Sequence, residues 1–178
     1  VHDRSASPAT QGHEESVYLS DLLGNTVVDG HGRRIGRLRD VSARVTSAGR
    51  PPVVGLLIRR RGTDLMLAAD DVAYPANGIM SVGMGSSPPT AVARQAHEVL
   101  LGRDIVDSQV IDLHGHRIVR VNDVLLERSA EAWHVTGVDI GIRALLRRLL
   151  PRTLRRRHGG EHVLAWADIE IFAGDRAR

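Results

Sequence analysis

The sequence predicts an all-β protein built from two small β-barrels in tandem. Three observations carry this prediction: short runs rich in valine, isoleucine and leucine, turn-prone residues between those runs, and a block of sequence that occurs twice. Several short strands within about 70 residues are typical of a small barrel. Closure of the barrel also removes the edge strands that would otherwise pair with other chains.

Residues 32–41 and 115–124 are the two copies of the repeated block. At a constant offset of 83 positions, six of the ten residues are identical. Four matching blocks in one order predict that the chain arose by internal duplication. The three other matches are 22–24 with 100–102, 53–58 with 135–140, and 67–72 with 164–169.

The chain is expected to divide into four parts. Residues 1–16 have no periodic apolar positions, which predicts a flexible tail. Residues 83–89 combine glycine, serine and a proline pair, which is typical of a linker. The folded parts are then a first domain over 17–82 and a second over 90–178. The chain begins with Val1 and has no apolar leader, which indicates a piece of a longer protein.

The apolar residues of the repeated block lie three apart, as in Ile35, Leu38 and Val41, whereas a flat strand would space them by two. This spacing predicts a bulge or sharp bend, a common feature where a barrel strand turns a corner. Helix is the alternative, but Gly36 and the β-branched neighbours argue against it. The other predicted strands include 109–113, 118–126, 133–138 and 162–166.

An insertion of about 15 residues follows Ile140 in the second copy and predicts a short amphipathic helix over about 141–150. Between Arg143 and Arg157 there are seven arginines and no acidic residue. Two interpretations stay open: the leucines cap a barrel end under solvated arginines, or the helix docks onto a neighbouring domain, a second copy of the chain, an acidic partner or anionic lipid. The candidate partner-binding residues are Arg143, Leu146, Arg147, Arg148, Leu150, Arg155, Arg156 and Arg157.

The composition excludes several classes of function. The chain has no cysteine, so it forms no disulfide, no cysteine nucleophile and no thiolate zinc site. All 24 basic residues are arginine, which indicates coding bias more than nucleic-acid binding. Five aromatic residues are few for a base-stacking platform. No apolar run approaches the roughly 20 residues that span a bilayer.

Histidines and aspartates recur at equivalent places in the two copies. His31, His114 and His116 lie in turns, where a metal site is one interpretation and an exposed polar turn the favoured one, because nothing fixes the remaining ligands. Asp40 and Asp123 are expected to accept backbone N–H bonds or an arginine rather than to act as catalytic acids. The sequence therefore predicts no catalytic residue, no metal and no cofactor.

The repeated block also resembles a known family. The pattern G-x-x-I-G-x-L-x-D-V over Gly32–Val41, preceded by Leu-Gly and followed by a Val-Gly-Leu-Leu-Ile strand, resembles the PRC-barrel. In the second copy Val119 stands where the family has its second glycine. Over about residues 18–173, the chain resembles the tandem PRC-barrel region found in actinobacterial proteins ahead of an MgtE-type magnesium-transporter N domain.

This resemblance implies two small PRC-like barrels that form a non-catalytic protein-interaction or regulatory module. The module would lie in the cytoplasm, within a larger protein linked to divalent-cation transport. Its partner would be another protein, a neighbouring domain or a second copy of the chain, with a membrane approached only peripherally. The alternative is an RNA- or ribosome-associated barrel that uses the arginine-rich segment 143–157.

Overall fold

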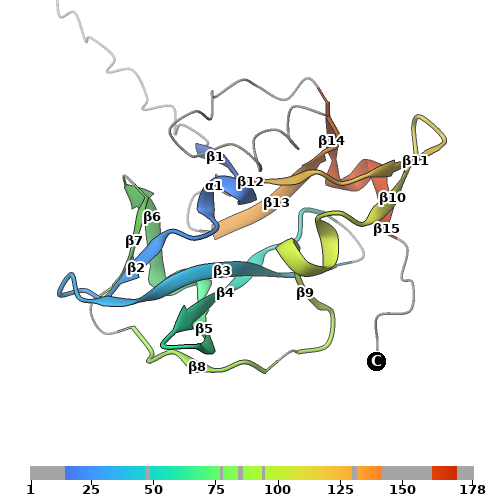
Figure 1. Ribbon diagram of the computed structural model, residues 1–178. Helices are drawn as coiled ribbons and strands as arrows, with labels where there is room; N and C mark the ends of the chain where they lie inside the picture. The colour runs from blue at the N-terminus through green and yellow to red at the C-terminus, as the bar shows by residue number, and fades with distance from the viewer. Residues whose placement is uncertain are drawn as a thin grey trace, which may run out of the picture.

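A computed structural model gives the fold of the chain (Figure 1). It describes residues 15–46, 49–76, 78–83, 86–93, 95–129, 132–141 and 162–171. Most of the predicted tail and all but Gly141 of the predicted helix over 141–150 lie outside these ranges. The first strand begins at Glu15, so it includes the last two residues of the predicted tail.

The described chain is mostly β-strand, which confirms the predicted all-β class. The strands of its first part are β1 (Glu15–Tyr18), β2 (Thr26–Val28), β3 (Arg34–Arg44), β4 (Val53–Arg60), β5 (Thr63–Ala68), β6 (Val72–Ala76), β7 (Ile79–Val82) and β8 (Thr90–Ala91). Those of its second part are β9 (Glu98–Leu100), β10 (Gln109–Asp112), β11 (Arg117–Arg120), β12 (Asp123–Ser129), β13 (Ala132–Asp139), β14 (Val163–Ala165) and β15 (Ile169–Ile171).

Within the described ranges these strands form three sheets. Two follow the orders β1-β12-β13-β14 and β11-β10-β15, and the third follows β6-β7-β2-β3-β4-β5-β8, with β9 added beside β3. Each order has two ends, so the pairings of the described strands show no closed barrel, and the predicted pair of barrels is not confirmed. No helix of the described chain is both long and apolar enough to cross a membrane.

The predicted bend in the repeated block is confirmed as a β-bulge. In the β3–β4 pair, Leu38 lies opposite Ile58 and Asp40 opposite Leu57, which leaves Arg39 as the extra residue. The interruption explains why apolar side chains three positions apart reach the core from one strand. The alternative of a helix over this block is therefore excluded.

We call the chain up to β8 the first half and the chain from β9 onward the second half. The first strand of each half pairs with a long strand of the other half. Strand β1 lies on β12, with Val17 opposite Leu126, and β9 lies on β3, with Val99 opposite Ala43. Figure 1 shows β1 beside β12, far from β3. The two pairs have the same register, since Ala43 and Leu126 are 83 positions apart, as in the repeated block. Each half is thus completed by a segment of the other.

A short helical turn follows each exchanged strand: α1 (Leu19–Leu22) after β1, and the wider turn η2 (Leu101–Ile105) after β9. Leu19 and Leu101 are both fully buried and are structurally equivalent. The predicted match of 22–24 with 100–102 is therefore wrong. The match by residue identity uses an offset of 78 positions, whereas the strand pairings place Leu19 with Leu101 at an offset of 82.

Apolar residues from both halves pack into one hydrophobic cluster. Burial of each large aliphatic side chain contributes about 1.5–3 kcal/mol to folding. Because the cluster is shared, the exchanged turns and the sheets stabilise one another. Its fully buried members include Leu19, Leu38, Val41, Ile58, Leu101, Val121, Val124 and Leu126.

Candidate functional site

The predicted partner-binding residues lie outside the described residues. The described chain ends at Gly141 and resumes at His162, and the whole predicted set falls between them. The amphipathic helix and its arginine run therefore remain predictions. The residues concerned are Arg143, Leu146, Arg147, Arg148, Leu150, Arg155, Arg156 and Arg157.

Asp40 is a buried carboxylate at the bulge of β3. Its Oδ1 accepts the N–H of Gly102 at 2.6 Å and that of Val41 at 2.8 Å, while its Oδ2 accepts the N–H of Arg103 at 3.0 Å. A Cβ on Gly102 would lie 2.9 Å from Oδ1, so only glycine lets the carboxylate approach this closely. Asp40 therefore holds the first turn of η2, which comes from the other half.

Asp123 has the same role in the second half. Its Oδ1 accepts the N–H of Ser20 at 3.1 Å and that of Val124 at 2.9 Å. Ser20 belongs to α1, so this carboxylate too holds a turn from the other half. These bonds confirm the prediction that the two aspartates accept backbone N–H groups. A carboxylate bound by several amides is a strong capping group.

The environment of Asp40 shifts its titration. Burial raises the pKa of this carboxyl above its usual value, although the N–H groups of Gly102, Val41 and Arg103 act in the opposite direction. The neighbouring carboxylate of Asp104 adds to the increase in pKa. The shift thus follows from the structural role, and it alone does not mark a catalytic acid.

The histidine turns are organised by aspartates. In the first half the carboxylate of Asp29 accepts the N–H of His31 at 2.9 Å and that of Arg33 at 2.8 Å. In the second half Asp112 accepts the N–H groups of His114 at 3.2 Å and Gly115 at 2.8 Å. Both are tight turns closed by an aspartate side chain.

The imidazole rings of the second turn do not converge. His114 Nε2 lies 3.1 Å from an Asp168 carboxylate oxygen, and His116 Nδ1 lies 3.0 Å from the carbonyl oxygen of His114. Across the described ranges, no three histidine, aspartate or glutamate side chains are grouped so as to hold a metal ion.

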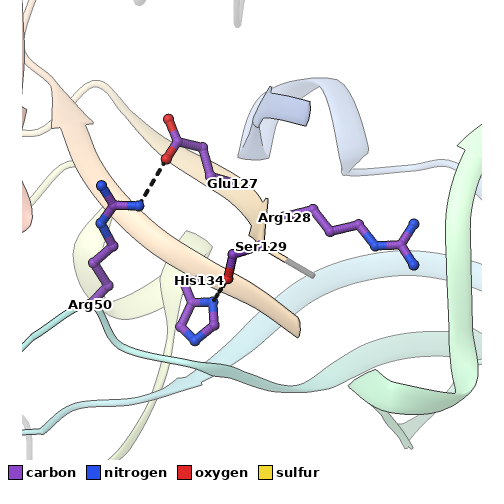
Figure 2. A pocket seen from close by; sticks show the side chains of 5 residues that line it. All are labelled: Arg50, Glu127, Arg128, Ser129 and His134. Atoms are coloured by element: carbon purple, nitrogen blue, oxygen red, sulfur yellow. Dashed lines mark hydrogen bonds and ion pairs between the residues drawn. The ribbon is translucent and has the colours of Figure 1, made fainter. Parts of the chain in front are cut away.

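A surface hollow of about 290 Å³ lies where the loop before β4 meets β12 and β13 (Figure 2). Arg50 Nη1 is 3.1 Å from Glu127 Oε2, and Ser129 Oγ is 3.4 Å from His134 Nδ1. Figure 2 shows Arg128, the fifth lining residue, extending away from the Arg50–Glu127 pair. The hollow therefore holds one ion pair and one long serine–histidine contact.

This arrangement gives no support to nucleophilic catalysis. An activated serine needs a base at about 2.6–3.2 Å, and that base needs a third group to orient it. Glu127 is the one acidic residue that lines the hollow, and it is paired with Arg50 rather than with His134.

A cluster of exposed arginines lies on β3 and the β4–β5 hairpin, and sequence reasoning did not find it. Arg37 is directly opposite Arg59, Arg39 is the bulge residue, and Arg61 lies at the hairpin tip. We call these four residues the arginine surface. Asp64 binds Arg59 through two contacts, at 2.6 and 2.7 Å. The run Arg59–Arg61 before Gly62 was the available signal, but only the strand register brings it beside Arg37.

The second half has no equivalent cluster among its described residues. Arg120, the counterpart of Arg37, pairs with Asp107 at 3.3 Å, whereas Arg37 Nη1 donates to the backbone oxygen of Gly24 at 3.1 Å. The offset of 83 aligns Asn122 with Arg39, and the offset of 82 between 53–58 and 135–140 aligns Gly141 with Arg59. Among the described residues, this cluster of exposed arginines therefore belongs to the first half.

No protein-family model matches the chain, and no curated protein matches it.

Proposed function

We propose that the chain is a non-catalytic interaction or regulatory module made of two PRC-like barrel units. The observation that carries this proposal is the use of Asp40 and Asp123. Both carboxylates are buried, and both accept N–H groups of the turns through which the halves complete each other. The two repeated aspartates are thus engaged in joining the halves.

The outer surface is where the two halves differ, and this also supports a contact role. The contacts that hold α1 and η2 are duplicated, whereas among the described residues the arginine surface is found in the first half alone. A scaffold that keeps its internal contacts while one face changes fits a module whose specificity lies in its surface.

The link to magnesium transport rests on the resemblance in sequence and forms part of the proposal. The reading frame of the source gene tests it directly. A transporter-type N domain encoded beyond Arg178 would support the link, whereas an unrelated domain or a stop codon would overturn it.

The contact role has its own test. The full chain and the domain encoded next to it are purified separately and titrated by calorimetry. Saturable binding with a Kd in the micromolar range or tighter, about −8 kcal/mol or better, supports a contact module. Turnover of a small molecule by the chain alone would contradict it.

The alternative role, RNA or ribosome binding through segment 143–157, is separated by a salt series. Tight RNA binding that falls steeply with salt would favour the alternative, because each neutralised phosphate releases a counterion. The absence of RNA affinity near physiological salt would remove it.

A further inference from the structure

The arginine surface brings like charges together at a cost to stability. Arg37 and Arg59 are directly opposite on neighbouring antiparallel strands, an arrangement in which like charges repel. Asp64 is the one carboxylate that contacts the surface in the described chain. Its hydrogen bonds to Arg59, with the positive charge of Arg39 nearby, hold the pKa of Asp64 below its usual value. In the described chain, Asp64 is therefore the one acidic side chain that offsets the positive charge of these four arginines.

The hairpin tip shows a second local cost. Arg61 has φ +50° and Gly62 has φ +87°, so both residues of this two-residue turn lie in the left-handed region. Such turns favour asparagine followed by glycine, because a Cβ is strained there and the short polar side chain of asparagine offsets the strain by hydrogen bonding locally. In the described chain no carboxylate pairs with Arg61. A strained residue that the fold does not require is a reason to look for a function.

The second half shows that the fold does not require these charges. It forms the same exchanged pairing and the same carboxylate cap with Arg120 neutralised by Asp107. It has Asn122 and Gly141 where the first half has Arg39 and Arg59. Within the part of the second half that the structure describes, the charges of Arg39 and Arg59 are thus absent while the shared contacts are kept.

We infer that the arginine surface binds an acidic polypeptide segment in an extended conformation. The inference rests on the proposed contact role and names the class of partner. Arg37 and Arg59 lie directly opposite one another, with Cβ atoms about 5 Å apart, and Arg39 follows two positions after Arg37 at the bulge of β3. Alternate side chains of an extended peptide are about 6.6 Å apart, so carboxylates on one face of such a peptide come within reach of these long guanidinium side chains.

The composition of this region favours a polypeptide over a nucleic acid. Residues 33–68 contain no phenylalanine, tyrosine, tryptophan or histidine. Proteins that hold unstacked bases place them on such rings, and the described surface offers none. The attraction that remains is between guanidinium and carboxylate groups, which acidic side chains satisfy without stacking.

Fluorescence anisotropy on the full chain tests the inference. The probe is a labelled peptide of about ten residues that alternates glutamate and serine, with a matched glutamine–serine peptide and a single-stranded RNA of about 20 nucleotides. The glutamate peptide is expected to bind, to weaken between about 50 and 300 mM salt, and to bind more tightly than either comparison probe. Tighter binding of the RNA, or equal binding of the glutamine peptide, would overturn the inference.

Two variants test whether peptide binding depends on the arginine surface or only on the net charge of the chain. Arg61→Asn should raise the Tm, because asparagine suits the left-handed turn, while it weakens peptide binding about twofold to fivefold. Arg39→Gln should weaken binding by a similar factor. The control is Arg128→Gln, which removes the same charge from an exposed position on β12.

An equal loss of binding in Arg128→Gln would show attraction by net charge alone and would overturn the assigned surface. So would an Arg61→Asn protein that is more stable and binds as tightly as the parent. If the peptide fails while the neighbouring domain still binds in calorimetry, this inference fails and the contact role stands. Failure of both would overturn the role itself.

Discussion

The two halves of the molecule share their internal contacts and differ in what surrounds them. Asp40 and Asp123 cap the exchanged turns in the same way, yet Asp40 lies opposite Leu57 and Asp123 lies opposite Asp139. The exchange of β1 and β9 between the halves thus forms whether an apolar or an acidic residue lies opposite the capping aspartate. The capping bonds and the buried leucines, rather than that neighbour, define the architecture.

The start of the repeated block shows how one irregularity changes a side chain's role. In the first half Ile35 is the extra residue of a bulge between Gly36 and Arg34, and it packs against the core. In the second half Ile118 pairs regularly with Ile111 and is 60% exposed. A bulge redirects the side chains that follow it, so identical residues end in different environments.

The largest effect is expected from removal of the buried leucines of the exchanged turns. Leu19→Ala and Leu101→Ala should each lower the free energy of unfolding by about 2–5 kcal/mol, because each leaves a cavity in the shared core. Chemical denaturation measures the loss. Hydrogen exchange should then show Leu19→Ala weakening protection of β12 more than that of β3, and Leu101→Ala doing the reverse. Equal loss in both strands would contradict a local exchange of segments.

A smaller effect separates two equivalent glycines. A Cβ on Gly137 would lie 2.5 Å from the backbone oxygen of Leu164, whereas one on Gly55 would lie 2.8 Å from the flexible Met66 sulfur. Gly137→Ala should therefore destabilise the chain by about 1–3 kcal/mol and Gly55→Ala by less, since methionine can move aside. Thermal unfolding of both variants measures the difference. A greater loss for Gly55→Ala would show that the equivalent strands do not pack as described.

The smallest effect is a dependence on pH. Burial raises the pKa of Asp40, so the folded chain binds this proton more tightly than the unfolded chain does. Between the ordinary value of 3.8 and the raised value, its contribution to stability should fall as pH rises. Asp40→Asn should remove that slope from a series of denaturation curves. An unchanged slope in the variant would contradict the raised pKa.

Asp112 provides a control of opposite sign. The N–H of Gly115, with Arg117 nearby, lowers the pKa of Asp112, so its contribution to stability should be lost as pH falls below 3.8. Asp112→Asn should therefore flatten the acid side of the same curves and leave the slope above 3.8 in place.

The sequence alone determined the class of fold and the positions of several strands, although the predicted strand 118–126 divides into β11 and β12. Runs rich in branched apolar residues marked β10, β13 and β14 to within two residues. The spacing of Ile35, Leu38 and Val41 predicted the bulge, and the repeated aspartates predicted backbone acceptors. These features are local, because they depend on which side chains follow one another along the chain.

Only the tertiary structure decided which half each strand completes. The apolar residues of β1 and β9 indicate that each segment packs on the core, but they do not specify which half provides the partner strand. The arginine surface likewise exists because the register of β3 on β4 places Arg37 against Arg59. Pairing between distant segments follows from how the whole core packs, and no single stretch of sequence contains that information.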